Sequence, residues 1–384
     1  MMIHLKTIAL AASALLLIGC GDSEGGDGNS NTGSLRVAIF NVGMARGYVD
    51  HAEERFAPIV EAINARADVD VFCLQEMYFD DDIDALLQGV SEVFPESYMN
   101  RTRLSDFADG EIMTAACTEQ EAAPLVDCTV PLCDDTADLT SCVLDNCGDH
   151  FNALSPDCQG CAASNLSLGN VPDIVDACTS GDAAQYIYDG HNGLLLLSKR
   201  PIENTLTTNF SSFFIARSVL YGEVSGLGIA CTHLTASLRE PVYNGNYASY
   251  GDENAAQITD LLNFTDMQRG SKPAIIAGDF NTGPAVGETI AASLPENYSK
   301  FEEAGWTNVN TASRQPMCTL CSENGLRSET STPRMIDHIV VKGARFSQVE
   351  RLFDQPIDIE KPDGTQLNVS LSDHFGLGTT IEWP

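Results

Sequence analysis

Short, almost wholly apolar segments recur along this chain and constrain its fold more than any other feature of the sequence. Segments 35–40, 69–74 and 273–277 are apolar at nearly every position, which is typical of strands covered on both faces. Segments 53–66 and 254–267 carry apolar residues three and four positions apart, which predicts amphipathic helices. The remaining predicted elements are strands at 193–197, 219–232 (two strands), 336–341, 346–353 and 376–382 and a short helix at 82–90. The pattern predicts an α/β protein with two packed mixed sheets and helices outside them.

Polar residues follow six of these apolar segments, at the points where the predicted strands end. The clusters contain Asn41, Gln75-Glu76, Thr232-His233, Asp279 with Asn281, Asp337, and Asp373-His374. One such cluster alone is usually an ordinary turn, but strand ends are also where α/β sheets place their chemistry. Six in succession therefore indicate an active site.

The order of these clusters resembles the endonuclease/exonuclease/phosphatase superfamily, the deoxyribonuclease I-like fold, from about Leu35 to Trp383. The segments that match the motifs of the superfamily are Asn41, Gln75-Glu76, Thr232-His233-Leu234, Gly278 to Asn281, and Ser372-Asp373-His374. The Arg-Ile-Asp-Tyr motif matches only in part, because Met335 separates Arg334 from Ile336 and His338 replaces the aromatic residue. The resemblance implies a four-layer α/β/β/α sandwich that hydrolyses a phosphate ester.

The chemistry of that reaction assigns expected roles to the metal-binding and basic residues. Phosphodiester hydrolysis needs a Lewis acid, a base for the attacking water and stabilisation of the leaving oxygen. Glu76 is a hard oxygen ligand suited to Mg²⁺, with Asn41 and Asp373 as supporting ligands and Ca²⁺ or Mn²⁺ as other possible ions. His374 is the expected general base, and Asp337 is expected to orient it.

The other polar residues are expected to contact the substrate. His233 would donate a proton to the phosphate or the leaving oxygen, and Asp279 and Asn281 would position the attacking water and the phosphate. His338 follows Asp337 on the same predicted strand, so its side chain should face the opposite side, outside the site. Three arginines are further candidates for substrate contacts: Arg217, Arg239 and Arg334.

Eight cysteines lie between residues 117 and 178, in a stretch that is poor in long apolar runs. Such a segment cannot build much of a core alone and is predicted to be a disulfide-rich insertion. Zinc is the alternative, because Cys158 and Cys161 have ligand spacing. Outside the insertion, a local disulfide is expected between Cys318 and Cys321. Cys73 and Cys231 lie in apolar strands and are expected to be buried thiols, with a mutual disulfide as the alternative.

The first twenty residues indicate export. Lys6 precedes an apolar run at 8–18 that is too short to span a bilayer and has the layout of a signal peptide. The run ends in Leu17-Ile18-Gly19-Cys20, which resembles the lipobox of bacterial lipoproteins. The resemblance implies a signal peptide at 1–19, lipidation of Cys20, a flexible tether at 20–34 and a folded domain at 35–384 with its insertion at 117–178. Gly21 after the cysteine favours anchoring in the outer membrane of the cell envelope. An ordinary secretory signal is the alternative.

The charge of the chain bears on its substrate. The sequence has 21 Lys and Arg against 54 Asp and Glu, a formal net charge of −33. A protein surface that binds nucleic acid through basic residues is therefore not expected. Metal ions can still bridge an anionic protein to a nucleic acid or a phospholipid. Residues 232–236 resemble the Thr-His-Leu-Gln-Ala of secreted sphingomyelinases, with Thr235 in place of Gln.

The favoured interpretation is therefore a membrane-anchored, metal-dependent phosphodiesterase acting on a phospholipid headgroup, of sphingomyelinase or phospholipase C type. An anchored deoxyribonuclease-like nuclease is the alternative enzyme, with nucleic acid as its substrate. A non-catalytic surface-binding lipoprotein on the same fold is the alternative of another class. No obligate protein partner is inferred.

Overall fold

The computed structural model describes residues 32–102, 115–133, 139–180, 187–213, 215–238, 241–328 and 330–384. A compact unit extends from Thr32 to Pro384. The predicted signal peptide, Cys20 and most of the predicted tether lie outside the described residues, as does Arg239. Within the described ranges, no helix combines the length and the apolar character needed to cross a bilayer.

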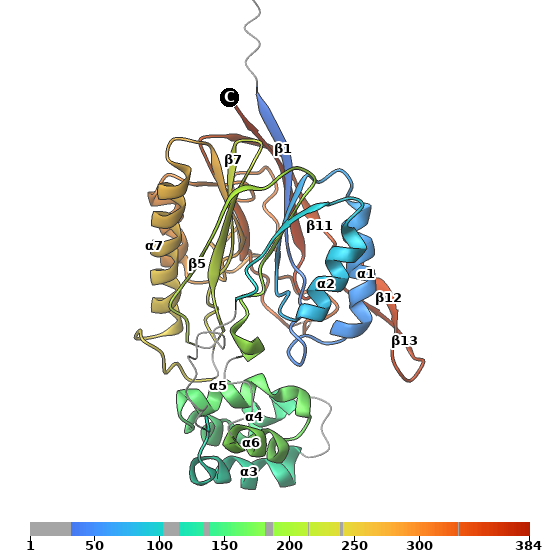
Figure 1. Cartoon of the computed structure of the whole chain (residues 1–384), viewed down its shortest axis with the longest axis vertical. Helices are drawn as coiled ribbons and strands as arrows, with labels where there is room; N and C mark the ends of the chain where they lie inside the picture. The colour runs from blue at the N-terminus through green and yellow to red at the C-terminus, as the bar shows by residue number, and fades with distance from the viewer. Residues whose placement is uncertain are drawn as a thin grey trace, which may run out of the picture. The chain divides into compact units, whose positions relative to one another are not determined.

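Two six-stranded sheets form the centre of the molecule (Figure 1). The first has the order β11 (Arg345–Leu352), β14 (Gly376–Trp383), β1 (Gly33–Asn41), β2 (Val71–Gln75), β4 (Leu195–Ser198) and β3 (Glu96–Tyr98). The second has the order β5 (Glu203–Asn209), β6 (Ser218–Val224), β7 (Leu227–His233), β8 (Ala274–Asp279), β10 (Asp337–Lys342) and β9 (Thr307–Asn308). Each sheet is mixed, because the β1–β2 and β7–β8 pairs are parallel while their neighbours are antiparallel.

Helices cover the outer face of each sheet, which confirms the predicted four-layer sandwich. The helices α1 (Ala52–Ala65) and α2 (Asp80–Val90) pack on the first sheet, and α7 (Tyr250–Arg269) and α8 (Pro295–Glu303) pack on the second (Figure 1). The side chains of β1 show why its sequence is apolar throughout. Val37 and Ile39 face the core between the sheets, whereas Ala38 and Phe40 face the helices.

The cysteine-rich insertion is helical. Its elements are α3 (Glu119–Cys133), α4 (Leu139–Asn152), α5 (Pro156–Ser164), the 3₁₀ turn Leu166–Leu168 and α6 (Val171–Ser180), followed by the 3₁₀ turn Ile187–Gly190. All eight cysteines pair, as predicted: Cys117–Cys158, Cys128–Cys147, Cys133–Cys142 and Cys161–Cys178. The helices also bury a small apolar core of their own. The backbone hydrogen bond from Cys117 to Cys178 joins the two ends of the insertion.

The prediction for Cys73 and Cys231 is wrong in its favoured form. The two residues form a disulfide, with their Cα atoms 5.6 Å apart, and they link β2 to β7 across the core between the sheets. Both cysteines face the core between the sheets, one from each sheet. Their side chains are therefore both buried and close enough to form a disulfide. The local disulfide between Cys318 and Cys321 is present as predicted.

Several elements differ from the sequence prediction. The strand β5 was not predicted, because its residues are mostly polar; it is an exposed strand at the edge of its sheet, next to β6. The helix α8, the short strands β3 and β9 and the hairpin of β12 (Ile357–Glu360) and β13 (Gln366–Val369) were also not predicted. The strand β1 begins at Gly33, inside the predicted tether, because Gly33 pairs with Trp383 of β14.

Candidate active site

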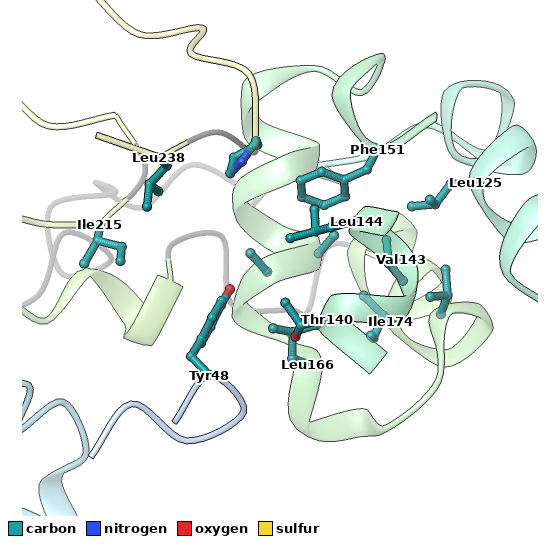
Figure 2. Close-up of a pocket in the computed structure, with 14 residues that line it drawn as sticks. Tyr48, Leu125, Thr140, Val143, Leu144, Phe151, Leu166, Ile174, Ile215 and Leu238 are labelled. Carbon is teal, nitrogen blue, oxygen red and sulfur yellow. The ribbon is translucent and has the colours of Figure 1, made fainter. Parts of the chain in front are cut away.

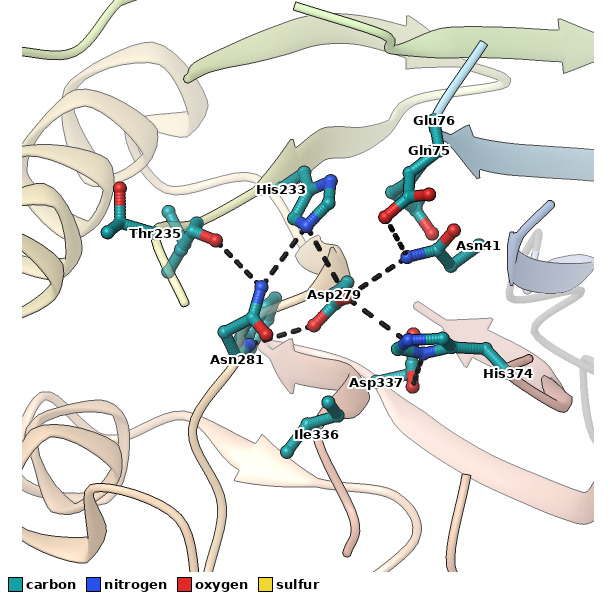
Figure 3. A network of polar contacts seen from close by, with 12 residues as sticks. Asn41, Gln75, Glu76, His233, Thr235, Asp279, Asn281, Ile336, Asp337 and His374 are labelled. Carbon is teal, nitrogen blue, oxygen red and sulfur yellow. Dashed lines mark hydrogen bonds and ion pairs between the residues drawn. The ribbon is translucent and has the colours of Figure 1, made fainter. Parts of the chain in front are cut away.

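The predicted site residues meet at one end of the two sheets, as Figure 3 shows. Strand register explains the meeting. In the second sheet Asp279 pairs with His233 on one side and with Asp337 on the other, so the three residues form a row. In the first sheet Asn41 pairs with Gln75, which places Glu76 beside it.

Asp279 lies at the centre of the polar network. Its Oδ2 atom is 3.1 Å from Asn41 Nδ2, 3.4 Å from His233 Nε2 and 3.9 Å from His374 Nδ1. Its Oδ1 atom accepts a hydrogen bond from the backbone N–H of Asn281 at 2.8 Å. Burial raises the pKa of Asp279, and the negative charge of Asp337 raises it further. The carboxyl group therefore ties both sheets together within the site.

His374 and Asp337 form the arrangement expected of a base and its orienting partner. The Nδ1 atom of His374 is 2.8 Å from Asp337 Oδ2, so Nδ1–H donates to the carboxylate and the proton-accepting position is Nε2. Burial alone would lower the pKa of His374, but the carboxylates of Asp337, Asp373 and Asp279 outweigh it and raise the pKa well above the ordinary value.

The environment of His233 lowers its pKa, whereas that of His374 raises the pKa of that residue. Burial lowers its pKa well below the ordinary value, and the positive charges of Arg217 and His374 lower it further. The Asn281 amide lies 3.1 Å from His233 Nε2 and also donates to the carbonyl oxygen of Leu234, which fixes the amide nitrogen on the histidine side. His233 Nδ1 is buried and has no hydrogen-bond partner among the described residues. Where the Asn281 amide donates to Nε2, a neutral His233 carries its proton on Nδ1.

Glu76 and Asp373 are suited to a divalent cation. Burial raises the pKa of Glu76, and the nearby Asp373 carboxylate raises it further, so the two acids repel each other without a cation. Asn41 Nδ2 donates to Glu76 Oε1 at 3.0 Å, and the Asn41 amide oxygen accepts from the backbone N–H of Gly43. Hard carboxylate oxygens are the ligands that Mg²⁺ and Ca²⁺ prefer. Asp373 is 22% exposed, which leaves this position open to solvent and substrate.

The backbone around the two acids is specialised to bring them together. Glu76 has a φ of 64°, rare for a non-glycine residue, and the following N–H of Met77 donates to the Gly193 carbonyl. Gly43 has a φ of 59°, and a Cβ atom there would lie 2.9 Å from Asp373 Oδ1. A glycine at this position is needed for the turn after β1 to approach Asp373.

A second possible metal-binding group lies in the same site. One ligand atom each from Asp279, Asp337 and His374 lie within 4.8 Å of one another. The hydrogen bond between His374 and Asp337 already accounts for this proximity. Glu76 and Asp373, whose charges act on each other, remain the candidate ligands for a cation.

Arg217 is a buried cation at the site. It precedes β6 and is 5% exposed, and its Nη1 donates to the Tyr78 hydroxyl at 3.4 Å. Its Nε has no hydrogen-bond partner among the described residues, and its charge acts on both Glu76 and His233. These properties suit an anionic substrate group. Arg334, the other described arginine considered from the sequence, is exposed on a loop.

Arg55, which was not predicted from the sequence, supports the backbone around the site. Its guanidinium is fully buried and donates to the carbonyls of Val42, Gly43 and Leu371. These contacts hold together the turn after β1 and the segment before Asp373. The signal was present in the sequence, because Arg55 falls on the same helical face as Ile59 and Ile63.

His338 lies outside the catalytic network, as its place on the strand predicted. Its Nε2 donates to the Thr282 carbonyl at 2.8 Å, so its Nδ1 accepts from the Asn308 amide at 2.6 Å. His191 is also buried, and its Nδ1 accepts from the backbone N–H of Gly193. Both histidines have structural contacts.

The solved structures that resemble this chain share its fold. Sphingomyelinase C from Streptomyces griseocarneus has a TM-score of 0.54 at 15% identity, covering 91% of this chain and 99% of that one. A mutant of beta toxin from Staphylococcus aureus with bound magnesium ions has a TM-score of 0.53 at 12% identity, covering 90% and 99%. A search of curated proteins finds no sequence match.

The family comparison covers nearly all of the folded chain. The profile of the Endonuclease/Exonuclease/phosphatase family matches residues 38–374, which include every site residue from Asn41 to His374. Enzymes of this family hydrolyse phosphoric esters, chiefly phosphodiesters, with the help of divalent metal ions. This chain therefore belongs to the Endonuclease/Exonuclease/phosphatase family and is a metal-dependent phosphodiester hydrolase.

Proposed function

We propose that this protein is a lipid-anchored phosphodiesterase of the bacterial cell envelope that cleaves the headgroup ester of a phospholipid, as sphingomyelinases and phospholipases C do. Cys20 would carry the lipid anchor, and the segment 21–34 would be the tether. Mg²⁺ is the proposed ion, held by Glu76 and Asp373 with support from Asn41.

Exposed apolar side chains on the loops that follow two of the site strands carry this proposal. Tyr48 and Leu238 are 39% and 37% exposed, and Val242 is also exposed. Tyr48 lies on the loop after β1, and Leu238 and Val242 lie on the loop after β7. The same two strands end in Asn41 and His233. Exposed apolar groups around a site favour a membrane or lipid substrate over a nucleic acid backbone.

The charge distribution supports the same choice. A nuclease usually neutralises several phosphates with Lys and Arg, whereas this chain carries 21 such residues against 54 acidic ones. Arg217 supplies one buried cation, enough for a single phosphate group. Among the fold neighbours, the sphingomyelinase and the magnesium-bound beta toxin are consistent with the proposed substrate class and ion.

The site residues divide the proposed reaction among them. His374 Nε2 accepts a proton from the attacking water, and Asp337 stabilises the imidazolium that forms. Asp279 and Asn281 hold the phosphate and the water in line. Arg217 and His233 stabilise negative charge on the phosphate and on the leaving alkoxide. The bound ion would supply Lewis-acid stabilisation of a phosphate oxygen.

A paired assay tests the proposed substrate. The full-length protein is given sphingomyelin and phosphatidylcholine vesicles in one series and plasmid DNA in another, each with Mg²⁺ and with an EDTA control. We expect phosphocholine release that EDTA abolishes, and no nicking of the plasmid. Nicking without phosphocholine release would contradict the proposal and identify an anchored nuclease instead. The His374→Ala variant controls for a contaminating activity in both series.

The anchor is tested separately. Cells expressing the protein are labelled with radioactive palmitate, and the protein is followed through membrane fractionation. We expect label in the wild type and none in a Cys20→Ser variant, with the wild type in the outer-membrane fraction. Unlabelled wild-type protein in the soluble fraction would show that the leader is an ordinary secretory signal.

A further inference from the structure

An apolar pocket lies where the cysteine-rich insertion meets the loops of the sandwich (Figure 2). Its volume is about 230 Å³. The insertion contributes mainly aliphatic and aromatic side chains, among them Leu125, Val143, Leu144, Phe151, Leu166 and Ile174. The sandwich contributes Tyr48, Ile215, Leu238 and Pro241. Among the lining side chains, only Tyr48 and Thr140 carry a polar group.

The loops that line the pocket also carry residues of the active site. Ile215 lies two residues before Arg217, a separation of roughly 7 Å in extended backbone. Tyr48 lies on the loop that follows Asn41, and Leu238 lies on the loop that follows His233. Three separate loops therefore connect the pocket directly to the site.

A series of aromatic rings in contact with one another lies between the pocket and the active site. Tyr48 makes an edge contact with Tyr188 at 6.2 Å, and Tyr188 stacks on Tyr78 at 3.9 Å. The Tyr78 hydroxyl accepts the hydrogen bond from Arg217, and Tyr78 lies two residues after Glu76. These packed rings link the segment that carries Glu76 to Tyr48, which lines the pocket.

Contacts between the insertion and the loops hold the pocket together. The backbone N–H of Val242 donates to the Asn152 side chain at 2.9 Å, and the Thr140 hydroxyl lies 3.4 Å from the Gly47 carbonyl. Disulfides fix the helices on the insertion side. The pocket is therefore largely preformed, so the protein would lose little conformational entropy when a ligand binds.

The apolar side chains that line the pocket favour a hydrocarbon ligand. Apolar cavities of ~150 Å³ stay dry and bind small hydrocarbons, and this pocket is larger. A charged or strongly polar ligand would lose its hydration without gaining hydrogen-bond partners. Tyr48 and Leu238 are exposed at the rim, where a chain entering from the site would pass.

We propose that this pocket binds one hydrocarbon chain of the lipid whose headgroup ester is cleaved at His374. The proposal rests on the phospholipid function proposed above and adds to it that the insertion is a substrate-binding element. It makes the enzyme selective for esters that carry a long alkyl or acyl chain. The soluble headgroup diester alone would be a poor substrate.

Direct binding tests the pocket independently of catalysis. The probe is the fluorescent fatty acid cis-parinaric acid, used below its aggregation concentration with full-length protein and EDTA. We expect wild-type protein to bind it and Leu238→Asp to weaken binding about tenfold, because a charge at the rim opposes entry of the chain. Leu144→Trp, which fills the pocket, should weaken binding as well. The matched control is Leu206→Asp on β5, which is 43% exposed, lies outside the pocket and should bind as the wild type does.

A chain-length series tests the link to the substrate. Butyl-, octyl- and dodecylphosphocholine are offered as monomers with Mg²⁺ to the same variants. In the wild type kcat/KM should rise by roughly two- to fourfold per added methylene until the pocket is full. Leu238→Asp and Leu144→Trp should flatten this dependence. Leu206→Asp should retain the dependence.

The two arms separate failure of this inference from failure of the proposed function. If no phosphocholine ester is hydrolysed, the phospholipid function fails, and with it the proposed link to substrate. If the esters are hydrolysed with equal chain-length dependence in wild type and pocket variants, the inference alone is wrong. Fatty-acid binding with such unchanged kinetics would mean that the pocket holds another chain, for example the acyl group of the anchor. Absence of fatty-acid binding to the wild type overturns the inference outright.

Discussion

The hydrogen bond between His374 Nδ1 and Asp337 Oδ2, 2.8 Å long, joins the two sheets of the sandwich. His374 lies two residues before β14 of the first sheet, whereas Asp337 begins β10 of the second. The proposed base and the group proposed to orient it therefore belong to different sheets. The packing of the sheets sets the geometry of this pair.

Replacing Asp337 tests this dependence. Asp337→Asn removes the carboxylate that holds His374 Nδ1–H, so we expect kcat to fall by about a hundredfold or more while the fold is retained. The pKa of His374 should also fall, because Asp337 is the main charge that raises it. The acidic limb of the kcat/KM profile against pH should therefore move to lower pH. A loss of activity in the folded variant without any such movement would contradict the role of Asp337 in raising the pKa of His374.

Glu76 is predicted to be the main metal ligand. Glu76→Gln removes a charge next to Asp373, so the apo protein should remain folded while its affinity for Mg²⁺ falls by about tenfold or more. Isothermal titration with Mg²⁺ measures the change. Glu323→Gln, at an exposed acidic residue paired with Arg351, is the matched control and should bind as the wild type does. Equal affinity in wild type and Glu76→Gln would contradict the assignment.

The Cys73–Cys231 disulfide is predicted to stabilise the fold more than the Cys318–Cys321 disulfide does. The first closes a sequence separation of 158 residues between the two sheets, and the second closes only 3. Constraint of the unfolded chain grows with loop length, so removing the first should cost about 4–5 kcal/mol and the second about 2 kcal/mol. Urea unfolding of the two paired cysteine-to-alanine variants compares them. The reverse order of stabilities would count against this account.

His338 is predicted to make stability depend on pH. Burial lowers its pKa to about 4. Protonation would also place an N–H on Nδ1, opposite the Asn308 amide that donates to it. The unfolded chain has the ordinary value near 6.5. The folded pKa is the lower one, so the stabilisation is complete above about pH 6.5 and is lost as the pH falls toward 4, by roughly 3 kcal/mol in all.

Urea unfolding at pH values above and below this window checks the effect. The wild type should lose more stability on acidification than His338→Gln, which keeps an amide for hydrogen bonding but does not titrate. Equal losses in the two proteins would show that His338 contributes nothing to the pH dependence.

Much of this architecture could be predicted from the sequence. Strands such as β1 and β8 are apolar on both faces because they lie between the other sheet and a layer of helices. That burial leaves a clear signal in the sequence. The polar clusters at the strand ends could be predicted as site residues for the same reason, because a polar residue directly after an apolar strand is easily recognised in the sequence. The structure brings Asn41, Glu76, His233, Asp279 and His374 together at one edge, as expected.

What the sequence could not supply depends on contacts between distant segments. The strand β5 is polar because it is an exposed edge, so it carries no apolar pattern to recognise. The disulfide partners of the insertion, and the Cys73–Cys231 pair, follow from how helices and sheets pack. Arg55 looked like part of an ordinary helix, because its role depends on carbonyls of Val42 and Leu371 that approach only in the folded state.

The central claim is that this site hydrolyses phosphodiesters with a divalent ion and His374 as the base. The most direct test measures release of p-nitrophenol from bis(p-nitrophenyl) phosphate by the wild type and by His374→Ala, each with Mg²⁺ and with excess EDTA. The account predicts activity in the wild type with Mg²⁺, its loss with EDTA, and at least about a hundredfold loss in a folded His374→Ala protein. Undiminished hydrolysis by folded His374→Ala, or by the wild type in EDTA, would contradict it.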